Sequence, residues 1–370
     1  MNNKIFVITQ CFPCGSWVCI EKIVEKLSEK KYKIYVLGLG KPSKRNNNFK
    51  YRLIPYFVYN RHGNITCYSP VLGLLWNLPL YFSSLLLTLL INPKIIIYNG
   101  LTLGLVLSPF FKLLRKKNII MYHSIIGDSD KTTKYILKVL FRFVDLVVVN
   151  STGMRDDLSE VVVKSKLIVN EHYAEDVFFN SPPKVIRPHT SLKILYAGRI
   201  DKDKRCFPLI DFAKKMKNNP NYEFIFVGAG ADVGMVENLH NEYKYIKYEG
   251  YINEKETLVN LYREADIVWA FADTTYLCLP AVESLACDTP IIIPSYAAIA
   301  NKDELINSSL VPPSIGWLVD PFDQNNIEDT LDRIMQDKEY LEKKCRQYAL
   351  QRYSVNNLLQ TVDIIEREIG

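Results

Sequence analysis

The sequence TTYLCLPAVESLACDTPIIIP (residues 274–294) contains the pattern that decides the fold. Glu283 begins a short run of small residues with helical character, and this run ends before Thr289-Pro290 and the apolar strand segment IIIP. A helix that leads directly into an apolar strand is typical of parallel sheets, whose strands are joined by helical crossovers. We therefore predict a helix that starts at Glu283, and its leading amide groups form an N-terminus suited to phosphate.

The same alternation of apolar runs and helix-like stretches extends toward both ends of the chain. Near-continuous valine and isoleucine runs joined by helices indicate parallel sheets that are covered on both faces. The runs form two sets, separated by SPPKVIRPHTS (residues 181–191), whose three prolines and polar residues indicate a linker. The first set is KIFVIT (4–9), KIYVLGLG (33–40), KIIIYNG (94–100), NIIMYH (118–123), LVVVN (146–150) and KLIVN (166–170), and the second is LKILYAGRI (192–200), YEFIFVGAG (222–230), IKYEGY (246–251), DIVWAFA (266–272) and TPIIIP (289–294).

Two doubly wound α/β domains account for this pattern in a chain of 370 residues. We predict an N-terminal domain over residues 1–184 and a C-terminal domain over residues 185–354. The tail is helical by periodicity and charge pairing, with RYS (352–354) as an interruption. We expect its last helix, about residues 355–370, to pack back on the first domain.

Composition narrows the class of protein. Hydrophobic residues make up 48% and charged residues 23% of the chain, which excludes a largely disordered, collagenous or coiled-coil protein. The start, MNNKIFVITQ, has no signal-peptide pattern, so we expect a cytoplasmic chain with reduced cysteines. Cys11, Cys14 and Cys19 have no second cysteine or histidine pair at zinc-finger spacing, and we therefore predict no metal site.

Charge is divided unevenly along the chain. Residues 1–150 carry 21 lysine and arginine against 6 aspartate and glutamate residues, whereas residues 151–370 carry 25 against 34. Within the basic half, residues 62–111 hold a single formal charge, that of Lys94. A basic and strongly apolar composition is typical of a surface that binds membranes, because anionic headgroups attract lysine and arginine while large apolar side chains enter the interface.

Residues 71–91 carry no charge and are long enough to span a bilayer. One crossing would place the two strand-like runs KIFVIT and KIIIYNG on opposite sides of the membrane. Pro79, with Gly73 and Asn77 nearby, also fits a broken, partly buried helix better than a lone span. We expect association with the inner face of a membrane through the N-terminal domain, and plain core packing and a true span remain the alternatives.

Two further segments carry candidate ligand-binding residues. In LYAGRIDKDKRCFPLIDFAKKM (195–216), Arg199 and Lys204 follow a strand at the edge where doubly wound sheets bind ligands. These cations can clamp a diphosphate, although a solvated basic turn explains the same string. Gly228 and Gly230 follow the next strand, where glycine permits close approach of a nucleotide or simply a tight turn.

Taken together, these segments resemble the retaining glycosyltransferases of the family 4 kind, whose GT-B fold consists of two Rossmann-like domains facing each other across a cleft. Those enzymes hold the sugar nucleotide with the pattern Glu, Gly, Phe, Gly, Leu, Pro, two residues, Glu, then Ala-x-Ala-x-Gly-x-Pro. The residues that match it here are Leu279, Pro280, Glu283, Ala286 and Pro290. The resemblance covers essentially the whole chain and includes the segments around residues 11–37, MYHS (121–124) and GRIDKDK (198–204).

The resemblance implies a role for each matching residue. His123 contacts the transferred sugar, Arg199 and Lys204 neutralise the diphosphate, and Glu283 holds the ribose. Tyr251 and Ile252 lie near the nucleobase. The implied catalytic residues are therefore His123, Arg199 and Lys204, and the implied donor-binding residues are Gly15, Ser16, Gly198, Gly228, Tyr251, Ile252, Thr275, Cys278, Leu279 and Glu283.

The chain also departs from the family pattern. Thr275 stands where the first glutamate belongs, Tyr276 and Cys278 replace the two loop glycines, and Asp288 and Ser16 replace two further glycines. Asp273 can substitute for the missing carboxylate if the loop is reshaped. These departures leave the nucleobase, the sugar and the acceptor open.

The function that the resemblance implies is transfer of a hexose from a nucleotide-diphosphate sugar to a lipid-linked or membrane-proximal glycan, with retention of configuration. No metal or other cofactor is expected, since no Asp-x-Asp motif ends a strand and DSD (128–130) fits a loop turn. No nucleic-acid partner is expected. The alternatives are a non-catalytic GT-B binding or partner subunit, and a different GT-B enzyme such as a nucleotide-sugar epimerase.

Overall fold

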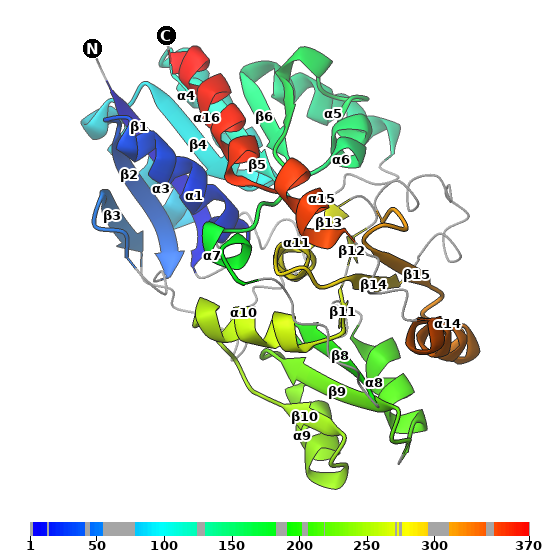
Figure 1. Cartoon of the computed structure of the whole chain (residues 1–370). Coiled ribbons are helices and arrows are strands. Elements are labelled where there is room, and N and C mark those ends of the chain that lie inside the picture. The colour runs from blue at the N-terminus through cyan, green and yellow to red at the C-terminus, as the bar shows by residue number, and fades with distance from the viewer. Residues whose placement is uncertain are drawn as a thin grey trace. The chain divides into compact units, whose positions relative to one another are not determined.

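The computed structural model describes residues 3–12, 15–40, 45–54, 78–123, 130–182, 191–201, 206–217, 219–270, 272–273, 276–294, 311–337 and 344–369. The chain divides into two compact units (Figure 1). Unit 1 comprises Met1–Glu171 and Asn357–Gly370, and unit 2 comprises His172–Asn356. No helix among the described residues is long and apolar enough to cross a membrane.

Unit 1 is built on a seven-stranded parallel sheet in the order β3-β2-β1-β4-β5-β6-β7. Its central strands, β4 and β5, consist of isoleucine-rich runs that are buried almost throughout, as expected for a sheet covered on both faces. Its elements are β1 (Lys4–Phe12), α1 (Gly15–Glu29), β2 (Lys33–Gly40), β3 (Phe49–Ile54), α3 (Leu78–Ile91), β4 (Ile95–Asn99), α4 (Leu101–Leu113), β5 (Lys117–Tyr122), α5 (Lys131–Leu140), η1 (Phe141–Phe143), β6 (Leu146–Val149), α6 (Thr152–Leu158), η2 (Lys164–Lys166), β7 (Leu167–Val169) and α16 (Val355–Ile369).

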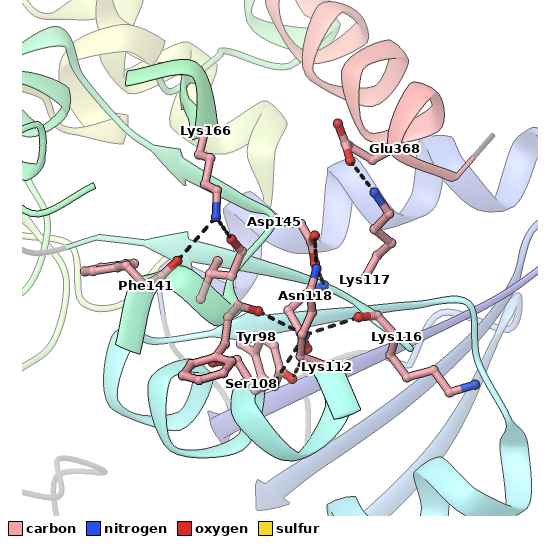
Figure 2. A network of polar contacts seen from close by, with 12 residues as sticks. Tyr98, Ser108, Lys112, Lys116, Lys117, Asn118, Phe141, Asp145, Lys166 and Glu368 are labelled. Carbon is pink, nitrogen blue, oxygen red and sulfur yellow. Dashed lines mark hydrogen bonds and ion pairs between the residues drawn. The ribbon is translucent and has the colours of Figure 1, made fainter. Parts of the chain in front are cut away.

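A polar network fixes the amino end of β5 (Figure 2). The Asn118 side chain is fully buried, and its Oδ1 accepts a hydrogen bond from the Tyr98 hydroxyl at 2.6 Å. Asp145 accepts the Asn118 backbone N–H at 2.8 Å and pairs with Lys112 at 2.5 Å. Because these polar groups are satisfied inside the protein, they hold the strand in register instead of destabilising it. The network lies at the end of β5 opposite to His123.

Unit 2 contains a six-stranded parallel sheet in the order β10-β9-β8-β11-β14-β15, and an additional two-stranded antiparallel pair, β12-β13. Two clusters of buried apolar side chains form its core; one contains Leu195, Val268 and Ile291, and the other contains Ile194, Trp269 and Ile292. Its elements are α7 (Asp176–Phe179), β8 (Leu192–Ala197), α8 (Phe207–Lys215), β9 (Tyr222–Val227), α9 (Val233–Glu242), β10 (Ile246–Tyr248), α10 (Lys255–Glu264), β11 (Ile267–Trp269), β12 (Ala272–Asp273), β13 (Tyr276–Leu277), α11 (Leu279–Ala286), β14 (Ile291–Pro294), β15 (Gly316–Val319), α14 (Gln324–Asp337) and α15 (Cys345–Arg352).

The structure differs from the sequence prediction at two boundaries and in the effect of Pro79. Residues 172–184 were assigned to the first domain, but unit 2 begins at His172, because the Phe178 side chain of α7 is buried in the core of unit 2. The prediction that a helix starts at Glu283 is wrong, since α11 begins at Leu279 and Glu283 lies in its second turn. Pro79 lies in the first turn of α3, where proline is tolerated, so it does not break that helix.

Candidate functional site

The carboxyl ends of β8, β9 and β10 carry three consecutive turns of unit 2. Gly198 follows β8, Gly228 follows β9 and Gly250 follows β10. The Gly198 N–H donates to the Val227 carbonyl at 2.9 Å, and the Gly228 N–H donates to the Gly250 carbonyl at 2.8 Å. The three turns are therefore one connected edge, at the end of a doubly wound sheet where ligands bind.

Packing explains why Gly228 is a glycine. Its φ is +142°, and a Cβ atom there would lie 1.8 Å from the Gly198 carbonyl oxygen. A Cβ at Gly230 would lie 2.3 Å from the Ile200 carbonyl oxygen. The Gly-x-Gly pattern thus permits the turn after β9 to pack against the turn after β8, which holds the backbone of the Arg199 segment in place.

Arg199 projects from this edge with its side chain about half exposed. Its Nη1 pairs with Asp201 Oδ2 at 2.6 Å. Asp201 is buried, and its Oδ1 accepts the Ala231 backbone N–H at 2.6 Å. The Tyr196 hydroxyl donates to the Arg199 carbonyl at 2.6 Å. Asp201 therefore fixes the position of a guanidinium group that remains accessible to an anion.

Glu283 is a partly buried carboxylate on α11. Its Oε2 accepts a hydrogen bond from the Tyr262 hydroxyl at 3.0 Å. Burial raises the pKa of Glu283 to about 7, and the nearby Glu175 carboxylate raises it further, whereas the Tyr262 hydrogen bond and Lys255 act in the opposite direction. A glutamate that titrates near neutrality is typical of a functional site.

The start of α11 lies close by in sequence. Cys278 is its N-cap residue and Leu279 its first residue, both are half-buried, and no side chain caps the helix. The first backbone N–H groups of α11 are thus not occupied by a capping side chain, which favours an anion at this helix end. Tyr251, just after Gly250, is 71% exposed, and Ile252 packs against the core of unit 2.

His123 lies at the carboxyl end of β5 in unit 1. Its Nδ1 lies 2.7 Å from Nδ2 of the buried Asn150. Because an amide nitrogen only donates, Nδ1 accepts this bond and the ring proton resides on Nε2. Nε2 is shielded from solvent and has no hydrogen-bond partner among the described residues. Burial lowers the pKa of His123 to about 4, so the ring is neutral at physiological pH.

Other polar side chains occupy the same edge of the unit 1 sheet. The Asn99 side chain, at the end of β4, donates to the buried Thr9 hydroxyl on β1 at 2.9 Å. Gly15 and Ser16 begin α1, just beyond the end of β1. The structure therefore brings His123, Gly15 and Ser16 to one edge of unit 1, and Arg199, Gly228, Tyr251 and Glu283 to unit 2.

Some predicted residues are outside the structural description, and some observed ones were not predicted. Lys204 and Thr275 lie outside the described residues, and Asp273 ends the short strand β12. Sequence reasoning did not identify Asn150, Asp201 and Tyr262 as partners of the site residues. Asn150 had a visible signal, because it is the polar residue that directly follows the buried run LVVV (146–149).

Comparisons with known proteins agree with this architecture. The family model described as "Glycosyl transferases group 1" matches residues 178–352. Similar solved structures include Anabaena HepE in complex with UDP, with TM-score 0.73 and 16% identity over 98% of this chain and 99% of that chain. Sucrose-phosphate synthase from Thermosynechococcus elongatus has TM-score 0.72 and 18% identity over 99% and 98%. A glycosyltransferase from Rickettsia africae has TM-score 0.70 and 14% identity over 100% and 98%.

No curated protein matches the sequence significantly. The solved structures nevertheless share the arrangement of two Rossmann-like, parallel-sheet units over nearly their whole length, which confirms the predicted fold. The family match covers nearly all of unit 2, including Arg199, Gly228 and Glu283. Residues 178–352 therefore match the glycosyl transferases group 1 model, and the chain as a whole has the GT-B fold.

Proposed function

We propose that this chain transfers a hexose from a nucleotide-diphosphate sugar to a lipid-linked or membrane-proximal glycan, with retention of anomeric configuration and without a metal ion. The observation that carries the proposal is the edge of unit 2, where the Arg199 guanidinium is fixed by Asp201 beside two packed glycine turns. This edge lies in the segment that matches glycosyl transferases group 1. The structural likeness to HepE in its complexes with UDP and UDP-glucose supports a nucleotide-sugar donor.

Each site residue has a role in this reaction. Arg199, together with Lys204, neutralises the diphosphate, and the start of α11 supplies backbone N–H groups to it. Glu283 accepts hydrogen bonds from the ribose hydroxyls. His123 donates from Nε2 to a hydroxyl of the transferred sugar, since its Nδ1 is already occupied by Asn150. Tyr251 offers an exposed ring near the base.

The chemical step exchanges one bond to the anomeric carbon for another. The bond between that carbon and the diphosphate oxygen breaks, and the acceptor oxygen attacks from the same face of the sugar. The acceptor proton moves to the leaving diphosphate oxygen. Positive charge held in advance at Arg199 stabilises the negative charge that develops on the diphosphate, so the protein contributes mainly electrostatic stabilisation.

The proposal is tested first by donor binding and then by turnover. A thermal-shift panel of UDP, GDP and their sugar nucleotides should identify a ligand that raises the melting temperature, because a ligand that binds only the folded state stabilises it. Arg199→Ala should then lower kcat/KM by about a hundredfold, equivalent to roughly 2–4 kcal/mol, with Arg199→Lys intermediate and the folded structure retained. Wild-type turnover in Arg199→Ala would refute the diphosphate role.

Product analysis separates the alternatives. Transfer or slow donor hydrolysis that persists in EDTA, with a product of unchanged anomeric configuration by NMR, supports the proposal in full. Donor binding without any turnover would identify a non-catalytic subunit. An epimerised nucleotide sugar would identify an epimerase.

A further inference from the structure

The outward side of α3 is an apolar stripe. Its exposed side chains are Leu78, Phe82, Leu86, Leu89 and Leu90, with exposed fractions between 50% and 72%. Spacings of four, four, three and one residues place them on one side of the helix. The residues that face the sheet, among them Leu80, Ser84 and Thr88, are buried. The helix therefore buries one side against the sheet and exposes an apolar side to the solvent.

Neighbouring helices continue this exposed apolar surface. Phe110 and Leu113 of α4 are 56% and 84% exposed, and Leu114 follows at 40%. On α5, Tyr135 and Ile136 are 69% and 52% exposed. Among the described residues, ten of the fourteen exposed large hydrophobic side chains lie on α3, α5 and the end of α4. Such a concentration marks an interaction surface, because isolated exposed apolar residues would be scattered.

Chain topology places these three helices on one face of the unit 1 sheet. The crossovers β3-α3-β4, β4-α4-β5 and β5-α5-β6 all run toward β7, whereas β1-α1-β2 runs toward β3. Because parallel crossovers are right-handed, the first three lie together and α1 lies on the opposite face. The Lys116 ammonium also contacts the Asn92 side chain, which ties the ends of α4 and α3 together. We call the outward sides of α3, α4 and α5 the α3–α5 face.

Cations outnumber acidic residues on the α3–α5 face, although Lys134 of α5 pairs with Glu160 and Lys112 of α4 pairs with Asp145. Residues 30–127 contain no aspartate or glutamate. Exposed cations on or beside the face include Arg115 in the turn after α4, and Lys131 and Lys138 on α5. Asp130 is also acidic, and its side chain caps the start of α5 by accepting the Thr133 N–H at 2.7 Å. The face therefore combines apolar side chains with positive charge.

We propose that the α3–α5 face docks on the surface of an anionic lipid bilayer. The docking rests on the proposed function, since it identifies the surface by which unit 1 reaches a membrane-proximal acceptor. A second copy of the same face would bring like charges together, whereas anionic headgroups attract them. At about 1.5 Å per residue, α3 is about 21 Å long and shorter than the bilayer core of about 30 Å, so it lies in the interface and does not span.

The contribution of apolar side chains to docking is tested with a matched pair of phenylalanines. Phe82 on α3 is 72% exposed and Phe322 in unit 2 is 73% exposed. The full-length protein is floated with vesicles of phosphatidylcholine alone and with equimolar phosphatidylcholine and phosphatidylglycerol. Phe82→Gln should weaken binding to the anionic vesicles by about tenfold or more, since a buried phenylalanine is lost. Phe322→Gln should leave binding unchanged.

The contribution of positive charge to docking is tested by charge reversal at two lysines that have no ion pair among the described residues. Lys131→Glu with Lys138→Glu should weaken binding to anionic vesicles by about 25-fold or more, because each cation at the surface contributes about fivefold. The control, Lys244→Glu with Lys344→Glu, makes the same change at exposed positions in unit 2. Lys116 and Lys117 are avoided, since they contact Asn92 and Glu368 within unit 1.

Three outcomes would overturn the docking. One is failure of the wild type to float with either vesicle, and another is equal loss in the test and control variants. The third is a lipid-free dimer that Phe82→Gln dissociates, which would identify the face as an interface between copies. Donor-induced thermal shift is measured on the same preparations. If the protein floats with vesicles but no donor raises its melting temperature, docking stands and the proposed function is refuted. If a donor raises the melting temperature but the protein does not float, docking alone is refuted.

Discussion

Glu283 couples stability to pH in an unusual direction. Its pKa of about 7 in the folded protein lies above the ordinary value of 4.5, so the folded state binds the proton more tightly than the unfolded state. Stability contributed by this group is therefore full below about pH 4.5 and is lost as the pH rises to about 7. The loss is on the order of 3 kcal/mol.

We predict from this that Glu283→Gln stabilises the protein above neutral pH by about 1–3 kcal/mol. The amide oxygen still accepts the Tyr262 hydroxyl, and no charge has to be buried. Donor affinity should fall by about tenfold, since a hydrogen bond to a charged acceptor is lost. Urea unfolding across the pH range and donor titration measure the two effects. A variant that is less stable than the wild type at alkaline pH would contradict the prediction.

His123 acts in the opposite direction. Its pKa of about 4 lies below the ordinary value of 6.5, so the unfolded chain binds the proton more tightly. Its contribution to stability is full above about pH 6.5 and is lost as the pH falls toward about 4, by about 3 kcal/mol.

We predict that His123→Gln removes this part of the acid destabilisation. Urea unfolding of the wild type and the variant is compared from neutral to acid pH. The difference between their free energies of unfolding should shrink on acidification. A constant difference would show that the His123 ring is not kept neutral by burial.

Local motifs in the sequence single out candidate site residues but not the side chains that contact them. His123, Arg199 and Glu283 were identified from local motifs, and the structure places each at the end of a strand or within a helix at a sheet edge. Asn150, Asp201 and Tyr262 were not identified as their partners. A partner such as Tyr262 is 21 residues from Glu283 in the chain and meets it only after α10 and α11 pack. Contacts of this kind are determined by tertiary packing and leave no local pattern.

At the scale of elements, hydrogen bonds join the end of α11 to the start of α15. Arg346, in the first turn of α15, donates from Nε to the Ala286 carbonyl at the end of α11 at 3.0 Å. Its other guanidinium nitrogens donate to the Ser181 carbonyl and hydroxyl, each at 2.9 Å. Asp288, just after α11, has φ +65° and accepts the Arg346 backbone N–H at 3.2 Å. The family's usual glycine at this position is explained by that positive φ, which aspartate tolerates better than most residues.

We predict that Arg346→Ala lowers the stability of unit 2 by about 2–4 kcal/mol, because several charged hydrogen bonds to buried acceptors are lost together. Arg155→Ala is the matched control, since Arg155 pairs with its exposed neighbour Asp156 and such pairs contribute little. Urea unfolding monitored by tryptophan fluorescence compares the two variants. Equal effects of the two substitutions would show that the contacts between α11 and α15 add no stability.

Element types were easier to predict from the sequence than element boundaries. The valine and isoleucine runs correctly indicated the parallel strands, since fully buried strands require such runs. The start of α11 was placed four residues late, although Leu279-Pro280 is a recognisable helix start because proline fits the first turn. The domain boundary was placed at the proline-rich segment, but α7 before it already packs on α10 and α11. Proline content indicates a bend, whereas the boundary depends on which core accepts the apolar side chains.

At the scale of the whole molecule, the chain leaves unit 1 after Glu171 and returns to it at Asn357. The returning helix α16 buries Leu358, Val362 and Ile365. Thr361 donates to the buried Asn170 side chain at 2.7 Å. Lys30 in the turn after α1 pairs with Asp363 and Glu366 at 2.7 and 2.6 Å. The last residues of the chain are therefore part of the core of unit 1.

This path predicts that a substitution near the C-terminus destabilises the N-terminal unit. Ile365→Ala removes a fully buried side chain from α16, at a cost of about 2–5 kcal/mol. Hydrogen exchange followed by mass spectrometry should show faster exchange in β4 and β5 of unit 1, with unit 2 unchanged, because local stability follows the core that is damaged. The matched variant Ile334→Ala, at an equally buried position on α14, should show the reverse. If both variants accelerated exchange equally in both units, the two units would unfold as one cooperative body, and donor binding to unit 2 would then protect unit 1 as well.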